Sequence, residues 1–427
     1  MKPTTDRANI FSSFFLHLHP RTIPASTLRF RLSLGLGGMA ATLFCVMVVS
    51  GLLQLLSYSP QPESAYSSIQ VLYKVGEMGG FVRNIHFWGG NLLVILSFLH
   101  LLRVFLTGAL DQKRRTNWLI GICLFILLLF TNFTGYLLPW DQLAYWAVTI
   151  FTNMLSYVPV LGEQLTYLFR GGNEVTASTL HIFFGLHVGL LPISLVVLLV
   201  FHFWQVRKAG GLVRQKEERE NRILVAPHLI SREIATASVL IAVLFTFASL
   251  VDAPLADPAN SGQSPNPAKA AWYFMGLQEL LLHLHPTVAI CIIPALMLLG
   301  FGAIPYIKGT TLPAGIWFGG HRGKRLALIV FLLTSLLTFV VVIIDEQLLH
   351  GASSSQAVNL WLYRGILPLG SLLLLQLVLY LVVTKIFGYS RAEGVMAIFV
   401  ANISIIVSLT VLGIWFRGGG MVLVYPF

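Results

Sequence analysis

Nine apolar segments, each long enough to cross a lipid bilayer, constrain this chain more than any other feature of its sequence. Of the 427 residues, 56% are hydrophobic and only 11% are charged. A backbone inside a bilayer must satisfy its own hydrogen bonds, so segments of about 20 apolar residues cross it as helices. The sequence therefore predicts an all-α polytopic membrane protein. Its transmembrane helices are expected near residues 32–58, 81–107, 117–138, 179–206, 233–251, 286–307, 325–345, 366–387 and 395–416.

The distribution of positive charge predicts how the chain crosses the membrane. If the N-terminus lies in the cytoplasm, 22 of the 28 lysines and arginines fall on the cytoplasmic side, as the positive-inside rule requires. The net charge of +11 then reflects topology and not nucleic-acid binding. The first 31 residues are polar, so we expect the first span to act as an uncleaved anchor in a bacterial inner membrane.

Two pairs of histidines lie within the predicted spans. His86 and His100 are fourteen residues apart in the second segment, and His187 and His202 are fifteen apart in the fourth. Fourteen helical residues rise about 21 Å and return close to the starting face. Polar groups at membrane depth are expensive and normally face a partner inside a bundle. Two helices that each offer two histidines at matching depths predict a four-helix bundle that clamps two flat metal-containing rings, a bis-histidine dihaem bundle.

Other interpretations of these histidines compete with haem ligation. A single histidine on an apolar helix face is more often a satisfied core residue, and a transporter or structural membrane subunit would use such side chains as ion ligands. The matched spacing in two separate spans favours haem over both. Cys45, Cys123 and Cys291 lie in apolar spans and form no C-x-x-C-H motif, so the haems are expected to be non-covalent.

Glycines in the first span repeat the histidine spacing. Gly37 and Gly51 are fourteen residues apart. Glycine lets a flat ring approach the backbone, although close helix packing is an equally ordinary use. Further along, Glu279 stands at the margin of an apolar segment without an obvious partner. We expect a raised pKa for this carboxyl and a role in proton transfer, with a solvated interface glutamate as the alternative.

Changes in composition divide the chain into five regions. We expect a cytoplasmic interfacial lead (1–31), a haem-binding four-helix module (32–206), a basic cytoplasmic linker (207–232), a second module with a loop and three helices (233–345), and two additional helices (346–427).

Several motifs in order resemble the cytochrome b family of quinol:cytochrome oxidoreductases over roughly residues 20–345. They are Gly37/Gly51, Arg83-x-x-His86, His100-x-x-Arg103, GYLLPW (135–140), TL-x-x-FF-x-LH (179–187) and His202. The first half is most similar to the chloroplast and cyanobacterial branch, through LPWDQ-x-x-YWAV (138–148), RKAGG (207–211) and the fifteen-residue histidine spacing.

The resemblance implies roles for these residues. His86 and His187 would bind the low-potential b haem near the outer face, and His100 and His202 the high-potential b haem near the cytoplasm. Arg83 and Arg103 would pair with haem propionates, which buried charges require. A quinol-oxidation pocket would lie between 136–146 and 272–279, with Tyr136, Tyr273 and Glu279 as catalytic residues. A quinone-reduction pocket would be bordered by Arg207, Arg232 and Glu233.

Three departures from the family pattern qualify these roles. The motif Pro-Glu-Trp-Tyr is replaced by Ala270-Ala271-Trp272-Tyr273, which removes the usual proton-accepting glutamate. Ile182 stands where the family has an arginine, and Gly35 where the chloroplast branch attaches an extra haem through cysteine. A covalent third haem is therefore not expected.

The resemblance implies a bacterial single-chain subunit that oxidises quinol, menaquinol or another, and passes electrons across the membrane while protons are translocated. Its expected partners are a Rieske-type iron–sulfur protein and a c-type cytochrome, in a homodimeric complex. The missing glutamate keeps an alternative open, in which the chain is a non-bifurcating haem conduit between the quinone pool and a multihaem cytochrome.

Overall fold

The computed structural model describes residues 21–74, 77–215, 221–349 and 359–425. Within these ranges, nine helices are long and apolar enough to cross a membrane, which confirms the predicted all-α polytopic class. They are α3 (Leu36–Leu55), α5 (Glu77–Leu106), α6 (Arg115–Leu137), α9–η2–α10 (Ala177–Gly185, Leu186–Leu190 and Leu191–Lys208), α11 (Val225–Leu250), η4–α13 (Val288–Ile292 and Ile293–Ala303) with the 3-10 turn that follows to Tyr306, α14 (His321–Ile344) with the start of the turn that follows to Gln347, α15 (Leu367–Leu381) with the turns on either side of it (Leu362–Ile386 in all), and α16 (Arg391–Trp415).

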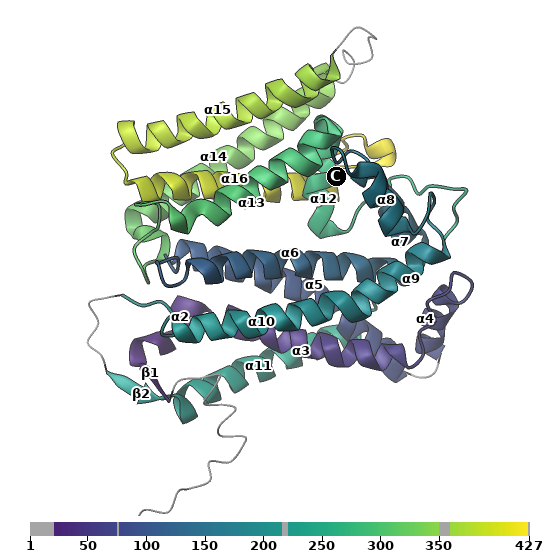
Figure 1. Cartoon of the computed structure of the whole chain (residues 1–427), viewed down its shortest axis with the longest axis horizontal. Coiled ribbons are helices and arrows are strands. Elements are labelled where there is room, and N and C mark those ends of the chain that lie inside the picture. The colour runs from purple at the N-terminus through teal and green to yellow at the C-terminus, as the bar shows by residue number, and fades with distance from the viewer. Residues whose placement is uncertain (1–20, 75–76, 216–220, 350–358, 426–427) are drawn as a thin grey trace, which may run out of the picture.

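The first four of these helices form a bundle (Figure 1). Helix α3 packs along α5, and α10 packs along α6, while α11 lies against α5 and α3. Leucines and valines with almost no exposed surface, such as Leu43, Leu93 and Val94, fill the interior of the bundle. The outward faces of these helices are apolar as well, as Leu52, Ile95 and Val196 show, which is expected of helices that cross a membrane.

A second layer of helices, α13 to α16, lies alongside the bundle (Figure 1). Its central helix is α16, with 13 of 25 residues buried, whereas α15 buries none of the residues of Leu367–Leu381. The two layers meet where Phe105 of α5 stacks on Phe399 of α16, with ring centroids 3.8 Å apart. The Trp118 indole of α6 also donates a hydrogen bond to the Phe301 carbonyl of α13 at 2.7 Å.

Short helices gather at the end of the bundle that carries His86, the His86 end. They are α4 (Ala65–Lys74), α7 (Gln142–Leu155), α8 (Gly162–Arg170), η3 (Trp272–Phe274) and α12 (Met275–His283). Asp141 begins α7, because its carboxylate accepts a hydrogen bond from Ala144 N at 2.9 Å. The same carboxylate accepts from Ala256 N at 3.0 Å, so it also holds the loop that leads to α12.

The opposite end, which carries His100, contains a small sheet. Strand β1 (Thr22–Pro24) pairs antiparallel with β2 (Arg222–Leu224), with Ile23 opposite Ile223. This pairing joins the expected lead to the expected linker. Helix α2 (Phe30–Ser33) comes after β1, at the end of the lead. Residues 1–20 of the lead and 216–220 of the linker lie outside the described residues. The remaining short 3-10 or π turns are η1 (Ala25–Leu28), η5 (Ile304–Tyr306), η6 (Trp317–Gly319), η7 (Asp345–Leu349), η9 (Leu362–Ile366), η10 (Val382–Ile386) and η11 (Gly419–Met421).

Candidate functional site

The four histidines singled out from the sequence meet inside the bundle in the expected pairs. The ring centroids of His86 and His187 are 6.1 Å apart, and those of His100 and His202 are 6.4 Å apart. Two imidazoles on opposite sides of one metal, each with an N–metal bond of about 2.0 Å, place their ring centres about 6 Å apart. Both separations therefore suit bis-histidine ligation of an iron.

Each histidine faces a glycine on a neighbouring helix. A Cβ atom added to Gly51 would lie 3.1 Å from Cε1 of His86, and one added to Gly37 would lie 3.1 Å from Cε1 of His100. From their spacing, we expected these glycines to clear space for a flat ring; in the structure, the group nearest to each of them is the imidazole. Gly51 and Gly37 therefore leave room for the imidazole rings of His86 and His100.

A second glycine pair was missed by the sequence analysis. A Cβ added to Gly135 of α6 would come within 2.5 Å of Cε1 of His187, and one added to Gly121 would lie 3.8 Å from Cε1 of His202. These two glycines are also fourteen residues apart. The same spacing that drew attention to Gly37 and Gly51 was therefore present in the third span.

The two histidine pairs differ in their hydrogen bonds. Nδ1 of His86 lies 2.9 Å from Ser50 Oγ, and Nδ1 of His187 lies 2.8 Å from the Thr131 carbonyl. A bond from Nδ1–H fixes the ring and leaves Nε2 as the metal-binding nitrogen. Within the described part of the chain, the buried Nδ1 atoms of His100 and His202 have no hydrogen-bond partner.

The two predicted propionate partners also differ. Arg103 is 4% exposed; its Nε donates to the Leu32 carbonyl at 2.8 Å, and its buried Nη2 has no partner among the described residues. A buried guanidinium nitrogen in this situation fits a carboxylate of a bound group. Together with the histidine separations and the facing glycines, it makes the bundle fit b-type haem.

Arg83 is already held by the loop after α11. Its guanidinium donates to the carbonyls of Ala253 at 2.8 Å and Pro254 at 2.7 Å, and to the Tyr73 hydroxyl. These bonds fasten α5 to the loop at the His86 end. A propionate contact by Arg83 stays a prediction.

At the His86 end, a narrow cavity of about 30 Å³, the apolar cavity, lies between α7 and the start of α12. The predicted segment 272–279 contributes to its lining, whereas residues 136–146 do not, so the predicted quinol pocket between these two segments stays a prediction. The lining residues of the apolar cavity are Phe133, Ala147, Ile150, Phe151, Met154, Ala270, Phe274, Leu277 and Gln278. None of these residues, all in the described part of the chain, carries an ionisable side chain. The volume is far below the roughly 300 Å³ of ligand-sized pockets, so a ligand requires one wall to move.

The predicted catalytic tyrosines lie near each other beside this region. Burial, and the electrostatic effect of the nearby Tyr136 phenol, raise the pKa of the Tyr273 hydroxyl above its ordinary value. Tyr273 is therefore a neutral phenol, and neither tyrosine lines the apolar cavity. Their catalytic role stays a prediction.

The expectation for Glu279 was wrong in two respects. Its carboxylate is fully buried and does have a partner, because Arg417 Nε donates to both of its oxygens at 3.0 and 3.1 Å. Burial alone would raise the pKa of Glu279, but hydrogen bonds and charge from His283 and Arg417 lower it below the ordinary value. No local sequence pattern indicates this pairing, since Arg417 lies 138 positions away from Glu279.

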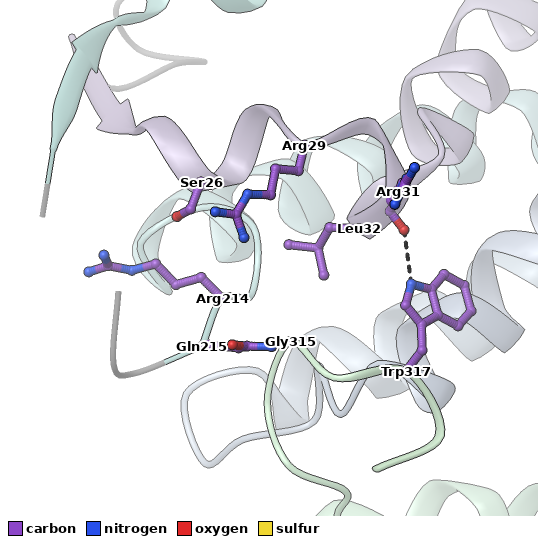
Figure 2. Close-up of a pocket in the computed structure, with 8 residues that line it drawn as sticks. All are labelled: Ser26, Arg29, Arg31, Leu32, Arg214, Gln215, Gly315 and Trp317. Atoms are coloured by element: carbon purple, nitrogen blue, oxygen red, sulfur yellow. Dashed lines mark hydrogen bonds between the residues drawn. The ribbon is translucent and has the colours of Figure 1, made fainter. Parts of the chain in front are cut away.

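At the His100 end, a larger cavity lies near Arg232, one of the three residues predicted to border a quinone-reduction pocket. Arg232 Nη1 donates to the Leu28 carbonyl at 2.6 Å, and the neighbouring Arg29 lines this cavity of about 420 Å³, the arginine cavity (Figure 2). Arg207, Arg232 and Glu233 are not among its lining residues. Those residues are Ser26, Arg29, Arg31, Leu32, Arg214, Gln215, Gly315 and Trp317.

The arginine cavity joins three parts of the chain that are distant in sequence. Figure 2 shows Arg29 and Arg31 on the lead, Arg214 on the linker, and Trp317 on the loop before α14. The Trp317 indole donates to the Arg31 carbonyl at 2.9 Å. Leu32, which accepts the Arg103 hydrogen bond, also lines the cavity. These arginines were not predicted as site residues, although the positive charge of residues 21–31 was an available signal.

Comparisons with known proteins agree with the motifs. The family model "Cytochrome b/b6/petB" matches residues 24–210. Cytochrome b6 of Heliobacterium mobile is 41% identical over 192 residues, which cover 45% of this chain and 88% of that protein. Cytochrome b6 of Synechococcus elongatus is 37% identical over 175 residues, 41% of this chain and 81% of that protein.

The whole fold also has a counterpart among solved structures. A chain of a hyperthermophilic respiratory Complex III superimposes with a TM-score of 0.67 over 95% of this chain and 97% of that chain, at 20% sequence identity. That likeness extends the shared fold beyond residues 24–210, which the family model matches. With its four helices, its paired histidines and its close relatives, this chain belongs to the cytochrome b/b6 family.

Proposed function

We propose that this chain is the dihaem cytochrome b subunit of a quinol:cytochrome c oxidoreductase, or of one with another high-potential acceptor. His86 and His187 hold one non-covalent b haem and His100 and His202 hold the other, and these haems supply one-electron transfer across the membrane. Quinol is oxidised near the outer face, at the apolar cavity. Quinone is reduced near the cytoplasmic face, and protons are translocated.

The observation that carries this proposal is the pair of facing histidine couples, at 6.1 and 6.4 Å, in two membrane-spanning elements. Neighbouring glycines that leave room for each imidazole strengthen it. Isolated core histidines would not occur as two couples at two depths with matching separations.

The proposal includes a setting for the subunit. The chain lies in a bacterial inner membrane with its N-terminus in the cytoplasm, as its lysine and arginine distribution favours. Its similarity to cytochrome b6 proteins and to a chain of a respiratory Complex III supports partners, a Rieske-type iron–sulfur protein and a c-type cytochrome, in a homodimeric complex.

A specific observation favours the alternative, a non-bifurcating haem conduit to a multihaem cytochrome. Ala271 stands in place of the family glutamate, and Glu279, the nearest substitute in the sequence, is held by Arg417. The described lining of the apolar cavity therefore offers no carboxylate to accept a quinol proton.

A redox titration of the purified complex tests the haem assignment. The absorbance of b haem should show two transitions in the wild type and one in His100→Ala. A single transition in the wild type, or no effect of His100→Ala, would contradict the haem assignment and indicate that the histidines are packing residues of the core.

Quinol pulses separate the two functions. With the quinone-reduction step inhibited, addition of quinol and an oxidant should transiently reduce both b haems if electrons bifurcate. Reduction that proceeds equally well without the oxidant would support the conduit.

A further inference from the structure

The last transmembrane helix and the segment after it have no role in the proposed function so far. Helix α16 packs closely on α12, and glycines on both helices lie at the contact, where a larger side chain would not fit. A Cβ on Gly276 would lie 2.9 Å from Thr410 Oγ1, and one on Gly413 would lie 2.8 Å from Met275 Cε. Met275 and Glu279 are both buried on this side of α12.

A cluster of charged groups joins the same two elements. The Glu279 cluster consists of Glu279 and His283 on α12, Asp345 and Glu346 on η7, and Arg417 just after α16. Arg417 donates to Glu279 and also to Glu346 Oε2 at 3.1 Å. His283 contacts Glu279 through Nε2 at 3.2 Å and Asp345 through Nδ1 at 2.6 Å.

Arg417 is itself held in place by the chain that follows it. Its Nη1 donates to the Met421 carbonyl at 2.9 Å, and Gly418 N donates to the Val422 carbonyl at 3.0 Å, which closes a turn around the guanidinium. Lys269, in the loop before α12, donates to the Ile414 carbonyl at 2.8 Å. The end of α16 is therefore hydrogen-bonded both to α12, through Arg417 and Glu279, and to the loop before α12, through Lys269.

The other face of α12 borders the apolar cavity, through Phe274 at its start, Leu277 and Gln278. Gln278 is fixed by two bonds of its own, to Ala270 N and Ala268 O, both at 2.7 Å. One short helix thus presents a buried carboxylate to Arg417 and a cavity wall to α7.

We propose that Arg417 is a positioning residue for the apolar cavity: by pairing with the buried Glu279, it fixes α12 as the immobile wall against which a quinone-type ring is held. The opening that such a ring requires then falls to the α7 side. This inference rests on the proposed function for the identity of the ligand, but not for the anchoring of α12.

The physical reason is the cost of an unpaired buried charge. Glu279 and Arg417 have no side-chain exposure, and removing one partner of such a pair is far more damaging than replacing both. Without the guanidinium, Glu279 keeps, among the described residues, only its contact with His283 at 3.2 Å. We therefore expect α12 to rotate or open so that water reaches the carboxylate, and Leu277 and Gln278 on its other face to move with it.

Hydrogen exchange measured on the whole complex tests the anchoring directly. In Arg417→Gln, amides of residues 275–283 should exchange at least about tenfold faster than in the wild type, while amides of α3, α5 and α6 do not change. Arg417→Gln/Glu279→Gln should recover most of the protection, because no buried charge is left unpaired. Arg391→Gln, at the exposed opposite end of α16, is the matched control.

Kinetics with a short-chain quinol test the positioning role. Arg417→Gln should raise KM about tenfold, lower kcat less, and leave both b-haem midpoint potentials unchanged, with partial rescue by Arg417→Lys. Wild-type exchange at α12 in Arg417→Gln would overturn the inference, as would a double variant as unprotected as the single one. If the wild type shows no quinol oxidation, the proposed function fails while the exchange result still decides the anchoring.

Discussion

The histidine bundle and the Glu279 cluster are both buried polar sites, yet they are built in opposite ways. In the bundle, residues that act together lie fourteen positions apart on single helices: His86 and His100 lie on α5, and Gly37 and Gly51 lie on the neighbouring helix α3. In the cluster, the decisive pair is Glu279 with Arg417, which are 138 positions apart. A periodic site can be recognised from one stretch of sequence, whereas a paired charge is visible only once distant segments are packed together.

Haem binding in the bundle should be lost most severely by substitution of the glycine that lies closest to a histidine ring, Gly135. In Gly135→Ala, the new Cβ would lie 2.5 Å from the His187 ring, so the imidazole must leave its position. We expect loss of one b haem, measured as about half the haem per chain by absorbance. Gly121→Ala, where the corresponding distance is 3.8 Å, should keep both. Equal haem content in the two variants would contradict the steric argument.

The cluster should respond to loss of charge and not to loss of volume. Glu279→Gln keeps the shape of the side chain but leaves Arg417 without its main partner. We expect a loss of about 3 kcal/mol in the free energy of unfolding, followed as thermal denaturation of the complex. Asp111 forms an ion pair with Arg114, and its side chain is 42% exposed. Asp111→Asn should therefore lower the free energy of unfolding by less than about 1 kcal/mol. Similar losses in both variants would remove the distinction between buried and exposed pairs.

The cluster should also make stability depend on pH. Burial opposes the charge on His283, but hydrogen bonds to Asp345 and Glu279 and their negative charges raise its pKa above the ordinary value. A raised folded-state pKa gives stability that is fully present below about pH 6.5 and is lost as the pH rises through the folded value. The melting temperature of the wild type should therefore fall relative to that of His283→Gln as the pH rises from 6.5. Parallel pH curves for the two proteins would place the protonation elsewhere.

The smallest expected effect sharpens the difference between the two histidine pairs. Ser50→Ala removes the oxygen that accepts from His86 Nδ1, which makes the imidazole a weaker donor to a bound iron. A lost hydrogen bond of about 1 kcal/mol corresponds to about 40 mV for a one-electron couple. The midpoint potential of that b haem should rise by this amount in a redox titration. The same shift in both haems would show that the effect is not local to His86.

The sequence by itself determined the class of fold, the nine spans and the grouping of the four histidines, because the bilayer demands long apolar helices and the helix repeat links residue spacing to depth. The family resemblance rested on the same local motifs, which the comparisons confirmed for residues 24–210. Even Gly121 and Gly135, which were overlooked, follow the same rule.

Only the tertiary structure decided three features: the environment of Glu279, the hydrogen bonds between the end of α16 and α12, and the placement of Arg29, Arg31 and Arg214 around one cavity. Each of these depends on segments separated by long stretches of chain, and a side chain carries no local sign of a partner that packing alone brings to it. A buried carboxylate with no neighbour in sequence predicts a raised pKa. The guanidinium supplied by the chain after the last helix reverses that shift, because a close positive charge stabilises the carboxylate more than burial penalises it.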